Sequence, residues 1–314
     1  MITKKSIIID CDPGQDDAVA LLMAFASRDV LEILGITTVA GNVPLDMTYR
    51  NAQIIADLAN INDVPILAGC DKPIRQSLIT AEHVHGKTGI EGMAISNPKQ
   101  KIYDQNGVDF IIQTLKSAQN KSVTLVPTGP LTNIAAALSR APEITEKIDQ
   151  IILMGGASFE GGNITPSAEF NIYVDPDAAA IVLASGVHVI MHGLDVTHKV
   201  LCTKERLEPI NALGSKVAAD VYGMLTYFNR FDSKKYSSPG APLHDPCTIA
   251  YLLAPELFSV KFCNVEVEVN SELTRGHTAV DFWHVTERHR NVGWVYDVDA
   301  DGFFDLLTEK LALY

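Results

Sequence analysis

The chain has 314 residues, 47% of them hydrophobic, which is enough to bury the core of one large domain or two small ones. Its formal net charge of −13 argues against binding to nucleic acid or to an anionic membrane surface, because both attract clustered Lys and Arg. No stretch approaches the roughly 20 apolar residues that span a bilayer, and the apolar run near the start is too short for a signal peptide.

The five cysteines are widely scattered and form no CxxC pair. This pattern is typical of small core residues in a reducing compartment rather than of a disulfide framework or a zinc site. We therefore expect a cytoplasmic protein.

The first predicted strand leads into a dense acidic stretch, SIIIDCDPGQDDAVA, at residues 6–20. Four of its residues are aspartates: Asp10, Asp12, Asp16 and Asp17. The Pro-Gly pair ends the strand, and the apolar residues that follow predict a helix. One Asp in such a place is usually a cap or a turn, but four together repel one another unless a cation joins them. Because no Lys or Arg lies between Lys5 and Arg28, we expect a hard metal such as calcium or magnesium.

Strand and helix signals alternate along the rest of the chain. We predict strands at 31–39, 64–69, 122–130, 151–154 and 188–191, with helices at 45–61, 107–118 and 176–184. Residues 71–101 show little periodicity, which is typical of a lid or binding loop. Residues 204–255 are predicted to be mainly helical, and strands at 261–269 and 292–298 precede a closing helix at 303–313.

This alternation predicts an α/β protein with a mainly parallel central sheet flanked by helices on both faces. A C-terminal extension adds strands and one helix. No linker or repeat divides the chain, so we expect a single domain over residues 1–314.

Further polar residues fall where ligands of open α/β sheets collect, at the carboxyl ends of strands. Asn42 and Thr128 each follow a predicted strand, although Thr128 also fits an ordinary turn. Asn163, Glu169 and Asn171 lie in a glycine-rich loop. Their side chains suit vicinal hydroxyl groups, and loop solubility explains them about equally well.

Two histidines and one more aspartate complete the candidates. Asp245 is either the N-cap of the following helix or a fifth carboxylate for the metal, and His244 beside it offers a proton donor. His85 is a weaker candidate of the same kind. The chain lacks GxxxxGK[ST] and GxGxxG motifs, which favours a neutral, hydroxyl-rich ligand over a nucleotide.

Six blocks in this order resemble the inosine–uridine-preferring nucleoside hydrolases: DCDPGQDDAVA, ITTVAGN, LVPTGPLTN, ILMGGA, the NxTPSAEFNIYVDP stretch and HDP. The resemblance runs from about Ile7 to the C-terminal helix. It implies a Rossmann-like domain that hydrolyses the N-glycosidic bond of ribonucleosides of the inosine, uridine or cytidine class. It also implies one Ca²⁺ per subunit and a homodimer or homotetramer, and it leaves the choice between purine and pyrimidine bases open.

The resemblance also implies roles for individual residues. The metal ligands would be the carboxylates of Asp12, Asp17 and Asp245 and the backbone carbonyl of Thr128, with Asp12 also the general base. The ribose would be bound by Asp16, Asn42, Asn163, Glu169 and Asn171, of which Asn163 and Glu169 would hold the 5′-hydroxyl. Met154 would line the pocket, His244 would take the place of the leaving-group acid, His85 would lie beside the base, and Asp10 would support the site from behind. A flap from Tyr227 to Pro242 would contribute Tyr236.

Two other functions remain open at this point. A strand ending in DxD also opens the haloacid-dehalogenase-like phosphatases, in which Asp10 would be the nucleophile and Asp12 the acid/base. That chemistry needs a downstream Ser/Thr and Lys for the phosphate, which the Asp16–Asp17 pair would repel. A non-catalytic nucleoside-binding protein would use the same residues but release the nucleoside intact.

Overall fold

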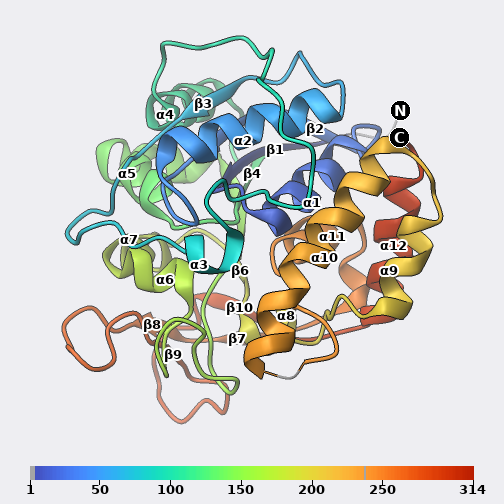
Figure 1. The fold of residues 1–314 in the computed structure, drawn as a ribbon. Coiled ribbons are helices and arrows are strands. Elements are labelled where there is room, and N and C mark those ends of the chain that lie inside the picture. The colour runs from blue at the N-terminus through green and yellow to red at the C-terminus, as the bar shows by residue number, and fades with distance from the viewer. Residues whose placement is uncertain (1–3, 237) are drawn as a thin grey trace.

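An eight-stranded sheet occupies the centre of the molecule in the computed structural model, which describes residues 4–236 and 238–314 and, within 231–236, the backbone alone (Figure 1). The strand order is β3-β2-β1-β4-β5-β6-β10-β7, and every neighbouring pair is parallel except β10 with β7. The strands are β1 (Lys5–Cys11), β2 (Leu31–Thr38), β3 (Ile66–Ala68), β4 (Val123–Pro127), β5 (Ile148–Met154), β6 (Val189–His192), β7 (Phe258–Cys263) and β10 (Val292–Val298). The predicted mainly parallel α/β sheet is therefore confirmed.

Helices cover both faces of this sheet because side chains alternate along each buried strand. In β1, Ile7 and Ile9 pack in one hydrophobic core and Ile8 packs in the other. The first core is closed by α1 (Gln15–Phe25), α2 (Leu45–Leu58), α9 (Lys204–Asn211), α10 (Lys216–Tyr236), α11 (Pro246–Leu253) and α12 (Ala300–Leu311). The second is closed by α4 (Gly107–Ser117), α5 (Thr132–Arg140) and α7 (Pro176–Leu183).

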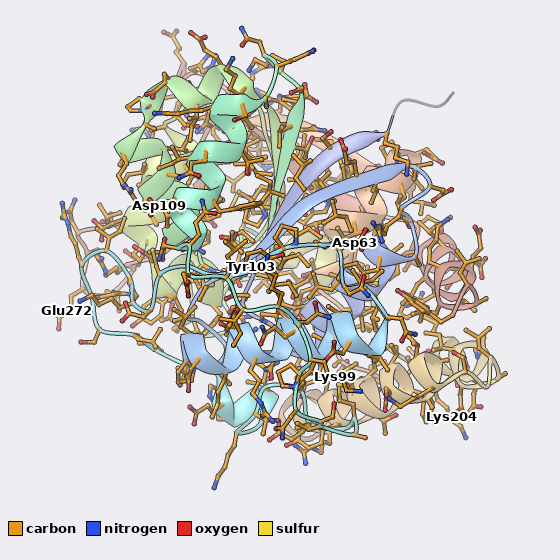
Figure 2. All side chains as sticks on the ribbon, turned by 90° about the horizontal axis from the view of Figure 1, so that it is seen from above. Asp63, Lys99, Tyr103, Asp109, Lys204 and Glu272 are labelled. Carbon is orange, nitrogen blue, oxygen red and sulfur yellow. The ribbon has the colours of Figure 1, made fainter. Side chains whose placement is uncertain are left out.

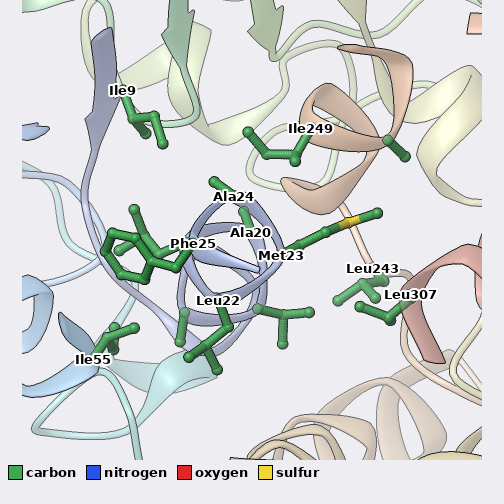
Figure 3. Close-up of a cluster of buried hydrophobic side chains, with 14 of the residues drawn as sticks. Ile9, Ala20, Leu22, Met23, Ala24, Phe25, Ile55, Leu243, Ile249 and Leu307 are labelled. Atoms are coloured by element: carbon green, nitrogen blue, oxygen red, sulfur yellow. The ribbon is translucent and has the colours of Figure 1, made fainter. Parts of the chain in front are cut away.

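Helix α1 is the most deeply placed helix of the first core. All eleven of its residues are buried, as expected of a helix that is apolar on every side. Figure 3 shows α1 end-on, with Ile9 of β1, Ile55 of α2 and Leu307 of α12 arranged around it. The aspartates at the start of α1 are therefore held by packing from several directions.

One predicted strand is wrong. Residues 261–269 do not form a single strand: β7 ends at Cys263, and β8 (Val265–Val267) pairs with β9 (Thr278–Val280) in a separate two-stranded antiparallel sheet. The side chain of Asn291 accepts a hydrogen bond from Val265 N at 2.8 Å, so the chain leaves the main sheet between the two strands. Alternating hydrophobicity did not reveal this break because it continues across it.

Short helices also escaped prediction, because each has too few residues to establish a period. They are α3 (Glu82–His85), α6 (Phe170–Val174), α8 (Leu194–Thr197) and the 3₁₀ turns η1 (Pro142–Lys147) and η2 (Pro255–Leu257). Helix α3 lies in the segment 71–101 that the sequence predicts as a loop.

Charged side chains such as Lys204 and Glu272 lie at the periphery of the molecule (Figure 2). All five cysteines are free, as predicted. In the described part of the chain, no helix combines the length and the apolar character needed to cross a membrane.

The assignment of Ile8 to the second hydrophobic core can be tested by measuring the stability of variants. Ile8→Ala removes a fully buried side chain and should cost roughly 2–5 kcal/mol of unfolding free energy, because it leaves a cavity under α4 and α5. Ile102→Ala is the matched control, since Ile102 is 75% exposed, and it should change stability by less than about 0.5 kcal/mol. Equal urea midpoints for the two variants would contradict this assignment of the core.

Candidate active site

Four buried carboxylates converge at the carboxyl edge of the sheet. Asp12 follows β1, Asp16 and Asp17 lie in the first turn of α1, and Asp245 directly precedes α11. Carboxylate oxygens of Asp16, Asp17 and Asp245 all lie within 4.8 Å of one another. Asp12 does not belong to this closely spaced set of three.

Two glycines and a backbone N–H group enclose Asp12. Its Oδ2 accepts a hydrogen bond from Asn42 N at 2.7 Å. A Cβ atom at Gly41 would lie 2.1 Å from Asp12 Oδ2, and one at Gly129 would lie 2.4 Å from Oδ1. The two glycines are therefore needed where β2 and β4 end, and Asp12 Oδ1 is left buried with no hydrogen-bond partner.

Asp17 is the best satisfied of the four. Its Oδ2 accepts hydrogen bonds from Gly14 N at 2.9 Å and Asn42 Nδ2 at 3.3 Å, and its Oδ1 accepts one from Thr128 Oγ1 at 2.8 Å. The N-terminus of α1 also favours a negative charge at this position. Asn42 lies beside the acidic cluster because β1 and β2 are parallel neighbours.

Asp245 occupies the N-cap position of α11, yet its side chain makes no capping hydrogen bond. Its carboxylate instead faces those of Asp16 and Asp17. Of the two interpretations that the sequence left open, capping is therefore excluded by the geometry.

Burial dominates the electrostatics of the cluster. Loss of solvent raises the pKa of Asp12 and of Asp245 well above the usual range, raises that of Asp16 to about 7, and raises that of Asp17. Repulsion between the neighbouring carboxylates adds to the rise in the pKa of Asp12, Asp16 and Asp245.

A divalent cation fits this donor set. Asp12 Oδ1 and Asp16 Oδ1 are buried without partners, and such atoms are costly unless a cation or a donor meets them. No Lys or Arg in the described chain forms an ion pair with any of the four carboxylates. Oxygen-only ligands match calcium and magnesium.

Asp10 belongs to the other side of the sheet. Its Oδ1 accepts hydrogen bonds from Thr37 Oγ1 and from Asn133 Nδ2 of α5. Burial raises the pKa of Asp10 to about 7. It lines no part of the cavity described below and lies behind Asp12.

Amides and one further carboxylate line the next part of the site. Glu169, the N-cap of α6, accepts hydrogen bonds from three backbone N–H groups, those of Asn171, Ile172 and Gly156, and burial raises its pKa to about 7. Asn171 Nδ2 donates to the carbonyl oxygen of Thr128 at 2.7 Å. No described side chain or backbone N–H donates to Asn171 Oδ1, and the Thr128 carbonyl, which accepts this one bond, keeps its second lone pair free.

Asn163 and Met154 lie at the edges of this group. Asn163 Oδ1 accepts a hydrogen bond from Phe170 N at 2.9 Å, which fixes the loop that carries it. Met154 ends β5, and its Sδ lies 3.4 Å from Asn171 Nδ2.

The two predicted histidines lie on separate elements. His85 ends α3, is buried and stacks on Phe228 of α10 with ring centroids 5.4 Å apart. His244 Nδ1 lies 2.7 Å from Thr197 Oγ1. Burial, with the neighbouring His198 and His85, holds the pKa of His244 well below its usual range.

A cavity of about 480 Å³ joins these groups. Ten predicted residues line it: Asp16, Asn42, His85, Thr128, Met154, Asn163, Glu169, Asn171, His244 and Asp245. Asp12 and Asp17 do not line it but contact its lining residues Asn42 and Thr128. The predicted role of Tyr236 falls on a side chain outside the described residues.

Sequence reasoning missed several lining residues, notably Phe228, His198 and Glu160. His198 Nδ1 lies 3.3 Å from Glu160 Oε2, and the rings of His198 and His244 are 5.8 Å apart. The position of His198 soon after β6, at the same sheet edge, was the one signal that could have identified it. Phe228 looks like any core residue of a long helix.

The chain belongs to the inosine-uridine preferring nucleoside hydrolase family, whose sequence model matches residues 7–305. It is similar to the pyrimidine-specific ribonucleoside hydrolase RihA of Shewanella oneidensis, with 46% identity over 98% of this chain and 96% of that protein. Its fold is similar to a purine-preferring ribonucleoside hydrolase from Gardnerella vaginalis (TM-score 0.90, 34% identity, 98% of each chain). A plant nucleoside hydrolase is similar at a TM-score of 0.91 and 31% identity, over 98% of this chain and 99% of that one. The protein is therefore an enzyme, a ribonucleoside hydrolase.

Variants of two neighbouring threonines test whether the hydrogen bond to Asp10, behind the site, stabilises the protein. Thr37→Val removes a hydroxyl that donates to buried Asp10, and should cost about 1–3 kcal/mol of stability. Thr38→Val is the matched control: its hydroxyl is equally buried but has no partner, so its removal should be neutral or stabilising. Urea unfolding of both variants measures the difference, and a Thr38→Val cost equal to that of Thr37→Val would contradict the assigned hydrogen bonds.

Proposed function

We propose that this enzyme hydrolyses the N-glycosidic bond of ribonucleosides with the help of one bound Ca²⁺, releasing free base and ribose. The observation that carries the proposal is a buried cluster of four carboxylates with two unpartnered oxygens, beside a cavity lined by amide and carboxylate groups. The family membership and the names of the relatives supply the reaction class.

The ion would be held by the carboxylates of Asp12, Asp17 and Asp245 and by the free lone pair of the Thr128 carbonyl. When bound, calcium lowers the pKa of a nearby water and offsets the charge of the cluster. Asp12 would take the proton of that water through Oδ1, the oxygen that no protein group occupies. Asp16, whose oxygen lies within the set of three, would stand between the ion and the sugar.

The sugar would be fixed through its hydroxyl groups. Asp16 Oδ1 is a buried acceptor without a partner, and Asn171 uses only its Nδ2 in hydrogen bonds to described residues. Asn42, Asn163 and Glu169 complete the surrounding polar wall. Breaking the glycosidic bond develops positive charge on the sugar. A cluster of buried carboxylates stabilises that charge more than it stabilises the neutral substrate, which is the requirement for lowering the barrier.

The leaving base would receive a proton from His244. Burial and the neighbouring His198 and His85 lower its pKa and so favour the neutral ring, which would need to take up a second proton from solvent before it protonates the base. A Thr197 hydroxyl that donates to Nδ1 of the neutral ring would keep the first proton on Nε2, the nitrogen with no partner among the described residues. His85, Met154 and Tyr236 would then contact the substrate rather than transfer the proton.

The alternative phosphatase chemistry is not favoured. Its nucleophile would be Asp10, which is engaged by Thr37 and Asn133 and does not line the cavity. The carboxylates that do line the cavity would repel a phosphate.

We also propose a base preference, a cellular location and an oligomeric state. A pyrimidine preference is supported by relatives of 44–46% identity named pyrimidine-specific, whereas the similar Gardnerella structure is named purine-preferring. The five free cysteines support a cytoplasmic location, and the family resemblance supports a homodimer or homotetramer. Initial rates on uridine, cytidine, inosine and adenosine would decide the base preference.

The base role of Asp12 is directly testable. Asp12→Asn should keep the fold but reduce kcat by about 10²–10⁴-fold, because an amide cannot accept the proton of the attacking water. Asp63→Asn, at an exposed ion pair, is the control and should leave kcat unchanged. A near-wild-type rate of base release by Asp12→Asn would remove Asp12 from this role.

Metal removal gives an independent test. Exhaustive chelation, verified by elemental analysis, should abolish base release and lower the melting temperature, since the carboxylates then lack a counter-charge. Added Ca²⁺ should restore both, with stabilisation that grows with its concentration. Full activity in verified metal-free enzyme would refute the calcium dependence.

A further inference from the structure

Gln15, the first residue of α1, is fully buried and its side-chain amide makes three contacts. Its Nε2 donates to the carbonyl oxygens of His85 at 2.9 Å and Glu91 at 3.3 Å. Its Oε1 lies 2.8 Å from His85 Nδ1. Turning the amide over would set its oxygen against two carbonyl oxygens, so the orientation of the amide is fixed.

This amide determines the tautomer of His85. An amide oxygen only accepts hydrogen bonds, so the shared proton must belong to His85 Nδ1. Burial, with a smaller contribution from His83, lowers the pKa of His85 to about 3. The ring therefore carries one proton at neutral pH, and Nε2 keeps its lone pair.

Packing around the His85 ring opposes any rotation that would move Nδ1 away from Gln15. Phe228 stacks on one face of His85, and a Cβ atom at Gly14 would lie only 2.5 Å from His85 Nδ1. The ring is therefore packed between α10 and the turn that precedes α1. His85 lines the cavity, and Nε2 makes no hydrogen bond to a described residue.

We propose that Gln15 is a positioning residue that holds His85 Nε2 as a hydrogen-bond acceptor for the nucleobase. This inference rests on the proposed function, because it requires a nucleoside whose base lies at the His85 end of the cavity. The site then selects bases with an N–H group on that edge. Uracil offers its ring N3–H, cytosine its exocyclic amine and hypoxanthine its ring N1–H, whereas 3-methyluracil has lost the donor.

The tautomer can be measured on the ligand-free, full-length enzyme by ¹⁵N NMR of the histidine rings, with His85 assigned by its absence in His85→Phe. In the wild type, Nδ1 should be pyrrole-like and Nε2 pyridine-like. In Gln15→Met, which removes all three contacts at similar volume, the two tautomers should mix. A protonated Nε2 in the wild type, or an unchanged tautomer in Gln15→Met, would overturn the proposal.

Asn51→Leu is the matched control variant. Asn51 is another buried amide that ties the same loop to the same turn, since its Nδ2 donates to the carbonyl oxygens of Pro13 and Thr88, and neither of these hydrogen bonds involves His85. A loosened loop alone should therefore leave the tautomer as in the wild type. A mixed tautomer in Asn51→Leu as well would assign the effect to loop structure and count against Gln15.

Kinetics supply the second readout. The wild type should favour uridine over 3-methyluridine in kcat/KM by roughly tenfold or more, the order of one net hydrogen bond, and Gln15→Met should lose most of this preference. An unchanged preference in Gln15→Met would mean that the methyl group is excluded by its size, which overturns the proposed selection.

Activity and tautomer are measured separately, so failure of the proposed function and failure of the Gln15 role can be told apart. A wild type that hydrolyses no nucleoside but shows the pyridine-like Nε2 would overturn the proposed function and leave the role of Gln15 on His85 standing. A wild type that hydrolyses uridine with Nε2 protonated would overturn this inference alone. The wild-type spectrum decides the point even if Gln15→Met fails to fold, and a retained Ca²⁺-induced rise in melting temperature shows that a variant keeps its metal site.

Discussion

Mutual repulsion among four buried carboxylates is the constraint on which the site depends. The Gly14 N–H just before α1, the Thr128 hydroxyl and the Asn42 amide satisfy Asp17. Oxygens of Asp12 and Asp16 are left without partners. Isolated negative charge in a protein interior costs far more than the surrounding fold can supply. The charge must therefore be neutralised, either by protons, as the raised pKa values of these carboxyl groups indicate, or by the cation proposed above. With the cation bound, the field of the carboxylates would favour a sugar on which positive charge develops.

The parallel sheet explains why these groups meet. Strands β2, β1 and β4 are neighbours, so their carboxyl ends deliver the Asn42, Asp12 and Thr128 positions side by side. The next strand, β5, ends at Met154 and opens into the loop that carries the amides. Ligand sites at this edge are general in open α/β sheets. In this protein, the side chains on the loops at that edge determine the chemistry of the site.

Much of this arrangement was predictable from local patterns. The apolar run before Asp10 and the apolar helix after Asp17 predicted β1 and α1, and the alternation of elements predicted the parallel sheet. Contacts that join distant segments were not predictable: nothing in the sequence links Gln15 to His85, seventy residues away. Local patterns alone did not place Asp245 either, because its position before α11 fits a cap equally well, and only the family resemblance assigned it to the metal. The break between β7 and β8 was hidden because the alternation of apolar residues runs through it.

The complete enclosure of α1 bears on how this family can diversify. Every side of the helix is already in contact with other parts of the core, so almost any exchange along it disturbs packing as well as the turn that gathers the acidic groups. We expect variation that alters which base is accepted to arise outside this packed part of the helix, in segments such as 71–101 and α10, where Phe228 and His85 meet, and at Gln15, where α1 begins. Packing would then constrain the middle of α1, while the residues around His85 could change.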